Sequence, residues 1–338
     1  MEENTPHYLK VATRPNGDPQ YSIPVALGQL AQRPMVKSLQ KEVWKSLEPE
    51  VQPAALSALT QYYDPPLRCF TFQGFQLAPT LEEYERLIGI PCDKSPPYLF
   101  KGHYPSLASV ARLLKVPKSE VLKLKKNQNG VEGIPEVALK RGSNIFRKKT
   151  CWLSWTYLVA IDAFLSKRDR GEHPVVAVLA NTYYTLDYCS KKNEKGLRCC
   201  TSLLILWLTV HLFHSSKRTR CLVEDHYWSC IKPLTKAEWT AHLDEAMEKS
   251  IRWYSQWNER EDVIIWCGGF PNISLMGTQG AINCNLELTL RQAGYSMVLP
   301  PFEEAVTPFI IHGLWIQEEE HLKKIRQAWK KVVRKGPE

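Results

Sequence analysis

The sequence predicts a mainly α fold, namely a single helical domain with a small N-terminal β-hairpin and minor strands. Long apolar stretches in the middle third have helical lengths and short polar connections, which is typical of packed antiparallel helices. A strand-rich stretch with its own turn signal precedes them. With 44% apolar and 23% charged residues among 338, the composition is that of a globular domain with a substantial core.

The chain is predicted to divide into three parts. Residues 1–35 form an irregular N-terminal arm, because prolines interrupt them and their apolar residues have little periodicity. Residues 36–312 form the helical domain, which opens with short helices over 37–44 and 54–62 and carries a basic loop at about 123–149. Residues 313–338 form a basic amphipathic C-terminal helix, centred on 317–335.

A hairpin is expected close to the start of the helical domain. Asp64-Pro65-Pro66 favours an extended or turned entry, because proline fixes its own φ and disfavours helix in the preceding residue. The run from Leu67 to Phe72 is rich in aromatic and β-compatible residues, and Gln73-Gly74 supplies the turn into Phe75-Gln76-Leu77.

A short capped helix follows the hairpin, in the sequence TLEEYERLIGIP. Thr80 is a good N-cap, and Glu83 three residues later completes a capping box. Apolar residues recur at helical spacing up to Ile88, and the glycine and proline that follow stop the helix. This stretch contains no nucleophile–base pair and no metal-ligand spacing, so it is a packing module.

Helices are expected to account for most of the middle of the chain. The stretch 151–165 is apolar on nearly all sides, as a central helix is, and a charged turn at 167–171 follows it. Residues 127–148 are expected to form a linker or loop. Further helices are expected at 106–114, 118–125, 175–188 and 199–213.

A second capping box begins the last third of the chain. Thr235 and Glu238 have the same spacing as the first pair, and an aromatic-rich stripe extends from Trp239 to Trp257. Residues 262–267 are expected to form a strand, and residues 286–292 a helix that glycine closes.

Three motifs occur in order between roughly residues 60 and 300: the hairpin with its TLEEYERLIGIP helix, the helices that end in LILWLTVHLF, and the string LRQAGY at 290–295. In this order they resemble the plant mobile domain (aminotransferase-like) family, specifically its legume retroelement-associated relatives of unknown function. Where many relatives have Trp-x-x-Glu-Arg-Phe, this chain has Val210-His211-Leu212-Phe213. The resemblance implies structural roles for Phe70, Phe72, Thr80, Leu81, Leu87, Gly89, Pro91, Arg291, Gln292 and Gly294.

The net charge of +9 is concentrated in one window. Residues 101–150 contain twelve lysines and arginines against three glutamates and no aspartate. Such a surface suits an acidic partner or nucleic-acid phosphates, although a solvated helix and loop surface has the same composition. The candidate patch comprises Lys123, Lys125, Lys126, Lys140, Arg141, Arg147, Lys148 and Lys149.

The ten cysteines are expected to be reduced and mostly buried, in a nuclear or cytoplasmic protein, because the amino terminus MEENTPHYLK has no apolar signal segment. The longest apolar run, 203–213, is too short to cross a bilayer.

One group has the residue types of a zinc site: Cys199, Cys200, His211, His214, Cys221, His226 and Cys230. Its first two cysteines open an apolar helix, where buried thiols are common, so zinc remains a hypothesis and we expect no metal or cofactor.

No pattern typical of an enzyme occurs. Pyridoxal phosphate chemistry uses a Schiff-base lysine and a phosphate cup, usually in a larger α/β fold, and no such alternation of strands and helices appears. The glycines at 268–269 and 277–280 lack the lysine and hydroxyl residue of a P-loop. We therefore expect that the chain is not an enzyme.

The resemblance implies a non-catalytic, transposon-derived interaction or scaffold domain with unknown protein partners, in the nucleus. The alternative is a Gag-like nucleic-acid-binding protein of a retroelement, which would contact nucleic acid weakly and without sequence specificity through the basic 112–149 window.

Overall fold

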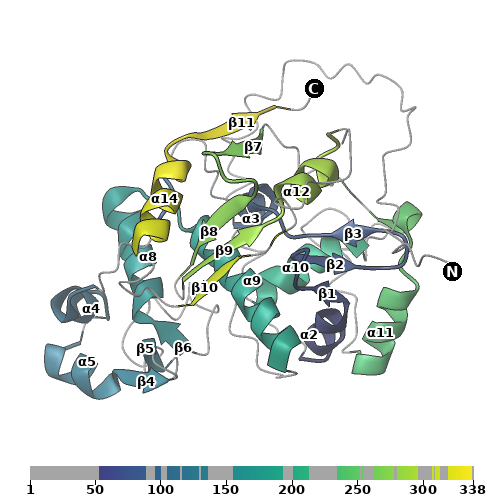
Figure 1. Cartoon of the computed structure of the whole chain (residues 1–338). Coiled ribbons are helices and arrows are strands. Elements are labelled where there is room, and N and C mark those ends of the chain that lie inside the picture. Colours follow the sequence, from purple (N-terminus) through teal and green to yellow (C-terminus); the bar gives the residue numbers. More distant parts are fainter. Residues whose placement is uncertain are drawn as a thin grey trace, which may run out of the picture.

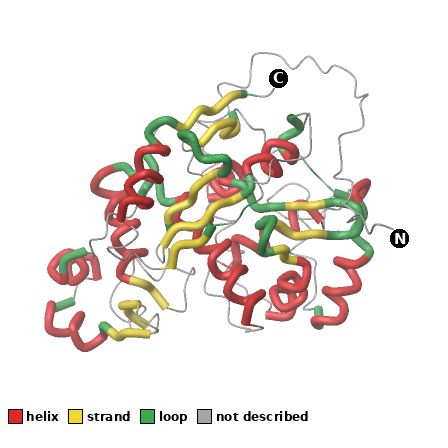
Figure 2. Tube along the Cα trace, viewed as in Figure 1, coloured by secondary structure: helices red, strands yellow, loops and turns green. Residues whose placement is uncertain are grey.

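A computed structural model describes residues 53–88, 96–99, 105–114, 116–128, 131–135, 155–192, 201–212, 234–251, 253, 262–277, 280–295, 307, 309–312 and 319–336. The predicted arm at 1–35 and the helix at 37–44 lie outside these residues. Of the described residues, 54% are helical and 19% lie in strands. The strands form three three-stranded sheets and one two-stranded ribbon, so the prediction of a mainly α domain was wrong. Helices and small sheets are mixed throughout (Figures 1 and 2).

The central sheet was not predicted. It consists of β8 (Ile273–Met276), β9 (Gly280–Cys284) and β10 (Ile310–His312), antiparallel in the order β10-β9-β8. Every residue of β8 and β9 is buried. Strands covered on both faces lack the alternation that marks a strand in a sequence. Helix α9 (Val175–Lys192) packs against β8 and β9, and α14 (Glu319–Trp329) contacts β8.

The turn between β8 and β9 requires glycine at Gly280. Its φ is 143°, and a Cβ atom there would lie 1.9 Å from the Ile311 carbonyl oxygen and 2.4 Å from the Tyr184 hydroxyl. The Gly277 N–H donates to the Gly280 carbonyl oxygen at 2.8 Å, so these glycines serve a turn.

The N-terminal module agrees with the prediction. β1 (Tyr63–Asp64), β2 (Cys69–Thr71) and β3 (Gln76–Leu77) form a sheet in that order, with the predicted hairpin as its last two strands. α2 (Pro53–Leu59) and the 3-10 turn η2 (Thr60–Tyr62) precede it, and α3 (Leu81–Ile88) follows it.

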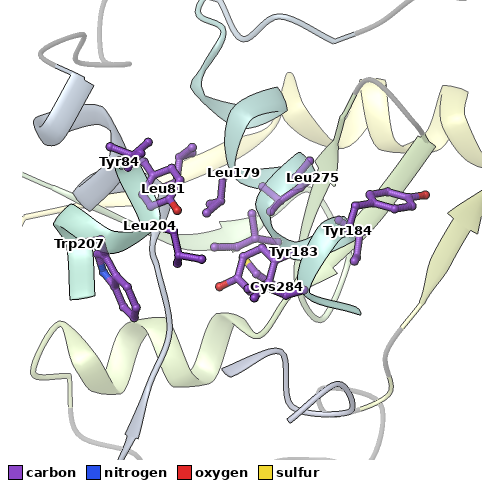
Figure 3. Packing of buried hydrophobic residues seen from close by; sticks show 14 of the residues in the cluster. Leu81, Tyr84, Leu179, Tyr183, Tyr184, Leu204, Trp207, Leu275 and Cys284 are labelled. Carbon is purple, nitrogen blue, oxygen red and sulfur yellow. The ribbon is translucent and has the colours of Figure 1, made fainter. Parts of the chain in front are cut away.

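Helices α3, α9 and α10 (Thr201–Leu212) pack together beside this module, and α11 (Lys236–Asp244) packs on α2. The largest fully buried side chains in this core include Trp207, Trp239, Tyr84 and Tyr183; Figure 3 shows the packing around α3, α9 and α10. The aromatic stripe predicted after Thr235 does not continue as one helix, because α11 ends at Asp244 and the short η4 (Glu248–Ser250) follows. No helix in the described ranges has the length and apolarity needed to cross a bilayer.

A second group of elements lies at one end of the molecule (Figure 1): α4 (Leu107–Leu114), α5 (Lys118–Leu124), β4 (Lys126–Gln128), β5 (Val131–Pro135), β6 (Trp155–Tyr157) and the start of α8 (Leu158–Arg170). The loop predicted at 127–148 therefore begins with two strands. The helix predicted at 151–165 starts later, after β6, and continues through most of the predicted charged turn. The strand β6 was missed because it pairs with β5, about twenty residues earlier in the sequence. Its own residues do not indicate that partner.

The C-terminal elements pack against one another. β7 (Val263–Cys267) and α12 (Leu286–Gln292) occur as predicted. The C-terminal helix predicted over 317–335 is shorter, because α14 ends at Trp329 and β11 (Val332–Lys335) pairs antiparallel with β7. β-branched valines at 332 and 333 fit either structure, and the distant partner strand decides between them.

Candidate functional site

Helix α3 carries an unusual concentration of buried charge. Glu82, Glu83 and Glu85 are 6%, 0% and 5% exposed, although glutamate is rarely buried unless it is paired. Each carboxylate contacts a segment that is more than one hundred residues away in the sequence. We call these three residues the α3 glutamates. They connect the N-terminal module to the C-terminal half of the chain.

Glu83 lies where the three sequence motifs meet. Its Oε2 accepts hydrogen bonds from the Thr80 backbone N–H at 3.0 Å and from the Trp207 indole Nε1 at 2.7 Å. Its Oε1 accepts a hydrogen bond from the Gln292 side-chain amide at 3.1 Å and lies 3.4 Å from His211 Nε2. Thr80 belongs to the first motif, Trp207 and His211 to the second, and Gln292 to the third. Motifs separated by up to two hundred residues therefore converge on one carboxylate.

Gln292 extends this junction to the hairpin. Its Nε2 donates to the Ala78 carbonyl oxygen at 2.9 Å, and its Oε1 accepts from the Ala78 N–H at 3.0 Å. The amide therefore pairs with the backbone in both directions and also reaches Glu83. Both the nitrogen and the oxygen of the Gln292 amide therefore have hydrogen-bond partners, as buried polar groups require.

Most residues that the resemblance marks as structural are part of this core. Phe70, Phe72, Thr80, Leu81 and Gln292 are buried, Leu87 and Arg291 are half-buried, and Gly294 is exposed. Gly294 has a φ of 88°, which suits its position after α12. Gly89 and Pro91 lie outside the described residues.

The other two α3 glutamates hold the β7–β11 ribbon. Glu82 Oε1 accepts from the Ile264 N–H of β7 at 3.0 Å. Glu85 Oε1 accepts from Arg334 Nη2 of β11 at 3.1 Å, and Arg334 Nη1 lies 3.5 Å from Asp262 Oδ1. Arg334 is only 16% exposed, so this ion pair is partly desolvated.

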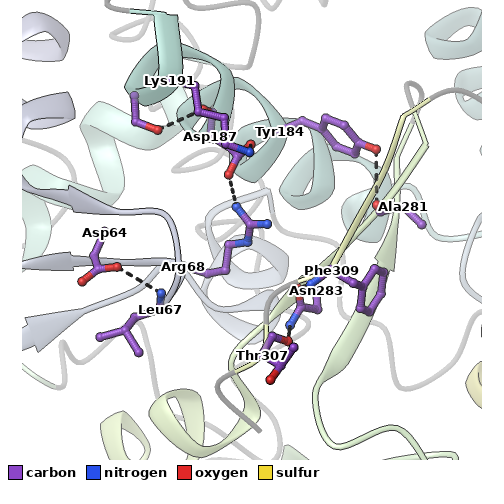
Figure 4. A network of polar contacts seen from close by, with 11 residues as sticks. Asp64, Leu67, Arg68, Tyr184, Asp187, Lys191, Ala281, Asn283, Thr307 and Phe309 are labelled. Atoms are coloured by element: carbon purple, nitrogen blue, oxygen red, sulfur yellow. Dashed lines mark hydrogen bonds and ion pairs between the residues drawn. The ribbon is translucent and has the colours of Figure 1, made fainter. Parts of the chain in front are cut away.

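A buried ion pair joins the hairpin to α9 (Figure 4). Arg68 Nη1 contacts Asp187 Oδ1, and both side chains are 3% exposed. Lys191 Nζ lies 2.8 Å from the other Asp187 oxygen. Arg68 has a φ of 56°, a left-handed conformation that costs roughly 1–2 kcal/mol for a non-glycine residue. Burial raises the pKa of nearby Tyr184, whose hydroxyl donates to the Ala281 carbonyl oxygen at 3.2 Å.

The described thiols are buried, as the sequence predicted. Cys69, Cys189, Cys267 and Cys284 are free and buried. Burial raises the pKa of Cys69 to about 12 and also raises the pKa of Cys267 and Cys284. Because the thiolate is the reactive form, these groups are poor nucleophiles and poor metal ligands.

Within the described ranges, no group of three or more histidine, cysteine, aspartate and glutamate side chains is arranged to hold a metal ion. Of the seven residues in the zinc hypothesis, only His211 lies in these ranges. Its imidazole is packed edge-on against the Trp207 ring, with ring centroids 5.4 Å apart, and faces Glu83. The six others lie outside the described residues.

A carboxylate beside an imidazole is a pair that general acid–base catalysis uses. Here Glu83 is 0% and His211 1% exposed, so no substrate reaches them while the core is closed. Both Glu83 oxygens already accept hydrogen bonds from the protein. The arrangement therefore acts as a packing junction.

The predicted basic patch is described only at its N-terminal end. Lys123 is exposed on α5, Lys125 is half-buried just after that helix, and Lys126 begins β4. Arg112 and Lys118 are also exposed, on the neighbouring helices α4 and α5. The remaining predicted members lie outside the described residues: Lys140, Arg141, Arg147, Lys148 and Lys149.

Sequence reasoning missed Arg68, Asp187, Glu82 and Glu85. The capping box identified Glu83 as a local helix cap and gave no sign of its distant partners. The Asp-Pro-Pro sequence predicted an irregular backbone just before Arg68. This was the one signal in the sequence for the unusual backbone conformation of Arg68.

The chain was compared with known protein families, curated proteins and solved structures. Two overlapping segments, 41–164 and 157–338, match the family described as Domain of unknown function (DUF7745). The chain belongs to the DUF7745 family. No curated protein and no solved structure matches it. The DUF7745 match spans every residue that the structure describes, including the α3 glutamates and their partners.

Proposed function

We propose that this DUF7745 chain is a non-catalytic, transposon-derived interaction or scaffold domain that resembles the plant mobile domain and acts in the nucleus. The observation that carries the proposal is the use of its buried ionisable groups. The α3 glutamates, Arg68 and Asp187 all connect distant segments. The described thiols are buried, and burial raises the pKa of Cys69, Cys267 and Cys284, which makes them unreactive. These groups hold a rigid body together, which suits a domain that presents surfaces to partners.

The proposal is tested by capture with the purified full chain as bait. Nuclear extract is treated with nuclease and loaded at high salt, so that partners held only by nucleic acid are removed. The scaffold proposal is supported if a protein is retained in stoichiometric amount and binds again when both components are purified. The proposal is contradicted if every partner is lost after nuclease treatment.

A second candidate function is the Gag-like one, in which the basic 112–149 window binds nucleic acid. The observation that favours it is the exposure of Arg112, Lys118 and Lys123 on the packed helices α4 and α5. Neutralising Lys123, Lys125, Lys126, Arg147, Lys148 and Lys149 together then abolishes salt-sensitive binding to a mixed DNA and RNA pool. Unchanged binding by this variant excludes the window as the contact site.

A further inference from the structure

Two exposed apolar side chains lie far apart in the molecule. Leu122 on α5 is 56% exposed, and Met247, between α11 and η4, is 48% exposed. Figure 1 shows α5 and α11 at opposite ends of the structure, so the two side chains do not contact each other within one chain. A single exposed apolar side chain does not mark an interface by itself. What distinguishes these two is the charge around each.

Leu122 lies among cations. Lys118 is one helical turn earlier and therefore on the same face of α5, and Lys123 follows Leu122 directly; both lysines are exposed. Arg112 is exposed on α4, which packs on α5. Glu120 is also exposed, but it lies two residues from Leu122 and does not share its face. These three cations and one acid give the surface, which we call the α5 face, a net charge of +2.

Met247 lies among acids. Asp244, Glu245 and Glu248 are all exposed and lie within three residues of it. Asp244 accepts a hydrogen bond from the Tyr62 hydroxyl at 2.6 Å, a neutral donor that leaves the carboxylate charge uncompensated. Four acids and two lysines are exposed over 235–249, which gives this surface, the α11 face, a net charge of −2. The other charges in that count are Lys236, Glu238 and Lys249.

We propose that the α5 face of one copy of this chain binds the α11 face of a second copy. The proposal rests on the scaffold function proposed above and names a partner for it. The two faces match because each places an exposed apolar side chain among charges, and the two sets of charges have opposite sign. A nucleic acid would be attracted to the α5 face but repelled by the α11 face.

The contact joins two different surfaces, so it is heterologous. A pair of copies therefore still presents one open face of each kind, and further copies add until the assembly closes into a ring or extends as a filament. Association of this kind would continue beyond a dimer, whereas a symmetric contact between identical faces would stop at one.

The test is sedimentation velocity of the purified full chain over a range of concentrations. The sedimentation coefficient is expected to rise with concentration at low salt and to rise less as added salt screens the charges. Leu122→Asp and Met247→Asp are each expected to lower the association constant roughly tenfold or more, because each removes one large apolar side chain from the contact. An equimolar mixture of the two variants forms a dimer and nothing larger, because each retains the face that the other lacks.

Charge reversal tests whether the two faces recognise each other. Lys118→Glu with Lys123→Glu changes the α5 face from +2 to −2, and Glu245→Lys with Glu248→Lys changes the α11 face from −2 to +2. Each double variant is expected to remain monomeric, because its two faces then have the same sign. All four substitutions in one chain restore association, because the two faces are again opposite in charge.

The matched control is Lys323→Glu with Lys324→Glu on α14. These lysines are 61% and 64% exposed, and their reversal changes the net charge of the chain by the same amount as reversal on α5. The control is expected to associate as the wild type does. Thermal unfolding followed by circular dichroism checks that every variant is folded, and the association constants of folded variants are compared.

Three results overturn the proposal. The first is a sedimentation coefficient of the wild type that does not change with concentration. The second is a four-substitution chain that associates no better than the double variants. The third is an equal loss of association in the α14 control, which shows a general effect of charge. Failure of the scaffold function is distinguished from these results because capture from nuclear extract detects other proteins whether or not the chain binds itself.

Discussion

Replacing Glu83 by alanine is expected to remove a large part of the stability of this chain. The side chain is fully buried and accepts three hydrogen bonds, from Thr80, Trp207 and Gln292. Each buried donor left without an acceptor costs about 1–3 kcal/mol, and the Thr80 N–H of the capping box is one of these three donors. The expected destabilisation is therefore about 3 kcal/mol or more, against a total of about 5–15 kcal/mol for a typical domain.

The chain contains its own control for this experiment. Glu238 forms the same capping box with Thr235, accepting from the Thr235 N–H at 2.7 Å while its own N–H donates to the Thr235 hydroxyl at 3.3 Å. Glu238 is exposed, and its hydrogen bonds within the described part of the chain are to Thr235. Glu238→Ala therefore removes the local cap alone and is expected to cause a far smaller loss.

The assay is urea denaturation followed by far-ultraviolet circular dichroism, with midpoints compared at constant slope. Glu83→Gln gives a third point, because it keeps the shape and one acceptor oxygen but turns an NH₂ group toward buried donors. We expect stability to decrease in the order wild type, Glu238→Ala, Glu83→Gln, Glu83→Ala. Equal midpoints for the two alanine variants would refute the argument that distant partners, and not the cap, make Glu83 important.

Three further predictions concern other parts of the core. Arg68→Ala destabilises the chain by at most about 3–5 kcal/mol, because Asp187 loses its buried partner but keeps Lys191. Arg68→Gly is more stable than Arg68→Ala in the same urea assay, because glycine adopts the left-handed backbone without strain. Gly280→Ala lowers the thermal midpoint far more than Gly269→Ala, since both have positive φ but only the first Cβ meets other atoms. The free energy of unfolding falls as pH rises from about 9 toward 12, because the pKa of the Cys69 thiol is raised in the folded chain and the thiol of the unfolded chain ionises first. A urea midpoint that does not change over that range contradicts this prediction.

Signals that depend on neighbouring residues predicted the structure well. Both capping boxes form as expected, because each needs only residues three apart. The hairpin turn at Gln73-Gly74 also forms, with Gly74 at a φ of 89°. Each of these elements is determined by the chemistry of a single turn of backbone, so the sequence alone contains the needed information.

Elements that depend on distant partners could not be predicted in this way. β8 and β9 are buried on both faces and show no alternation, so apolar runs there do not distinguish strand from helix. β11 was assigned to a helix because its valines also fit helical spacing, and only the presence of β7, more than sixty residues earlier, makes the strand favourable. The predicted fold class was wrong because strands of this kind form most of the sheets that were not predicted.

The candidate site illustrates the same limit for polar residues. A glutamate three residues after a threonine predicts a helix cap at the surface, as Glu238 is, and nothing nearby indicates that Glu83 is buried. The difference lies in Trp207 and Gln292, which approach Glu83 from other elements. Their contributions appear only when α10 and α12 are packed against α3.

A buried carboxylate is a costly way to gain stability, since well-packed apolar side chains of similar volume often stabilise a core as much or more. What Glu83 adds is a geometric requirement. Its hydrogen-bond partners come from the α3 cap, α10 and α12, and an arrangement that moved any one of these elements would leave a buried charge or donor unsatisfied. We infer that the α3 glutamates select one packing of segments that lie up to 249 residues apart. A fixed arrangement is what a domain needs if its function resides in its surfaces.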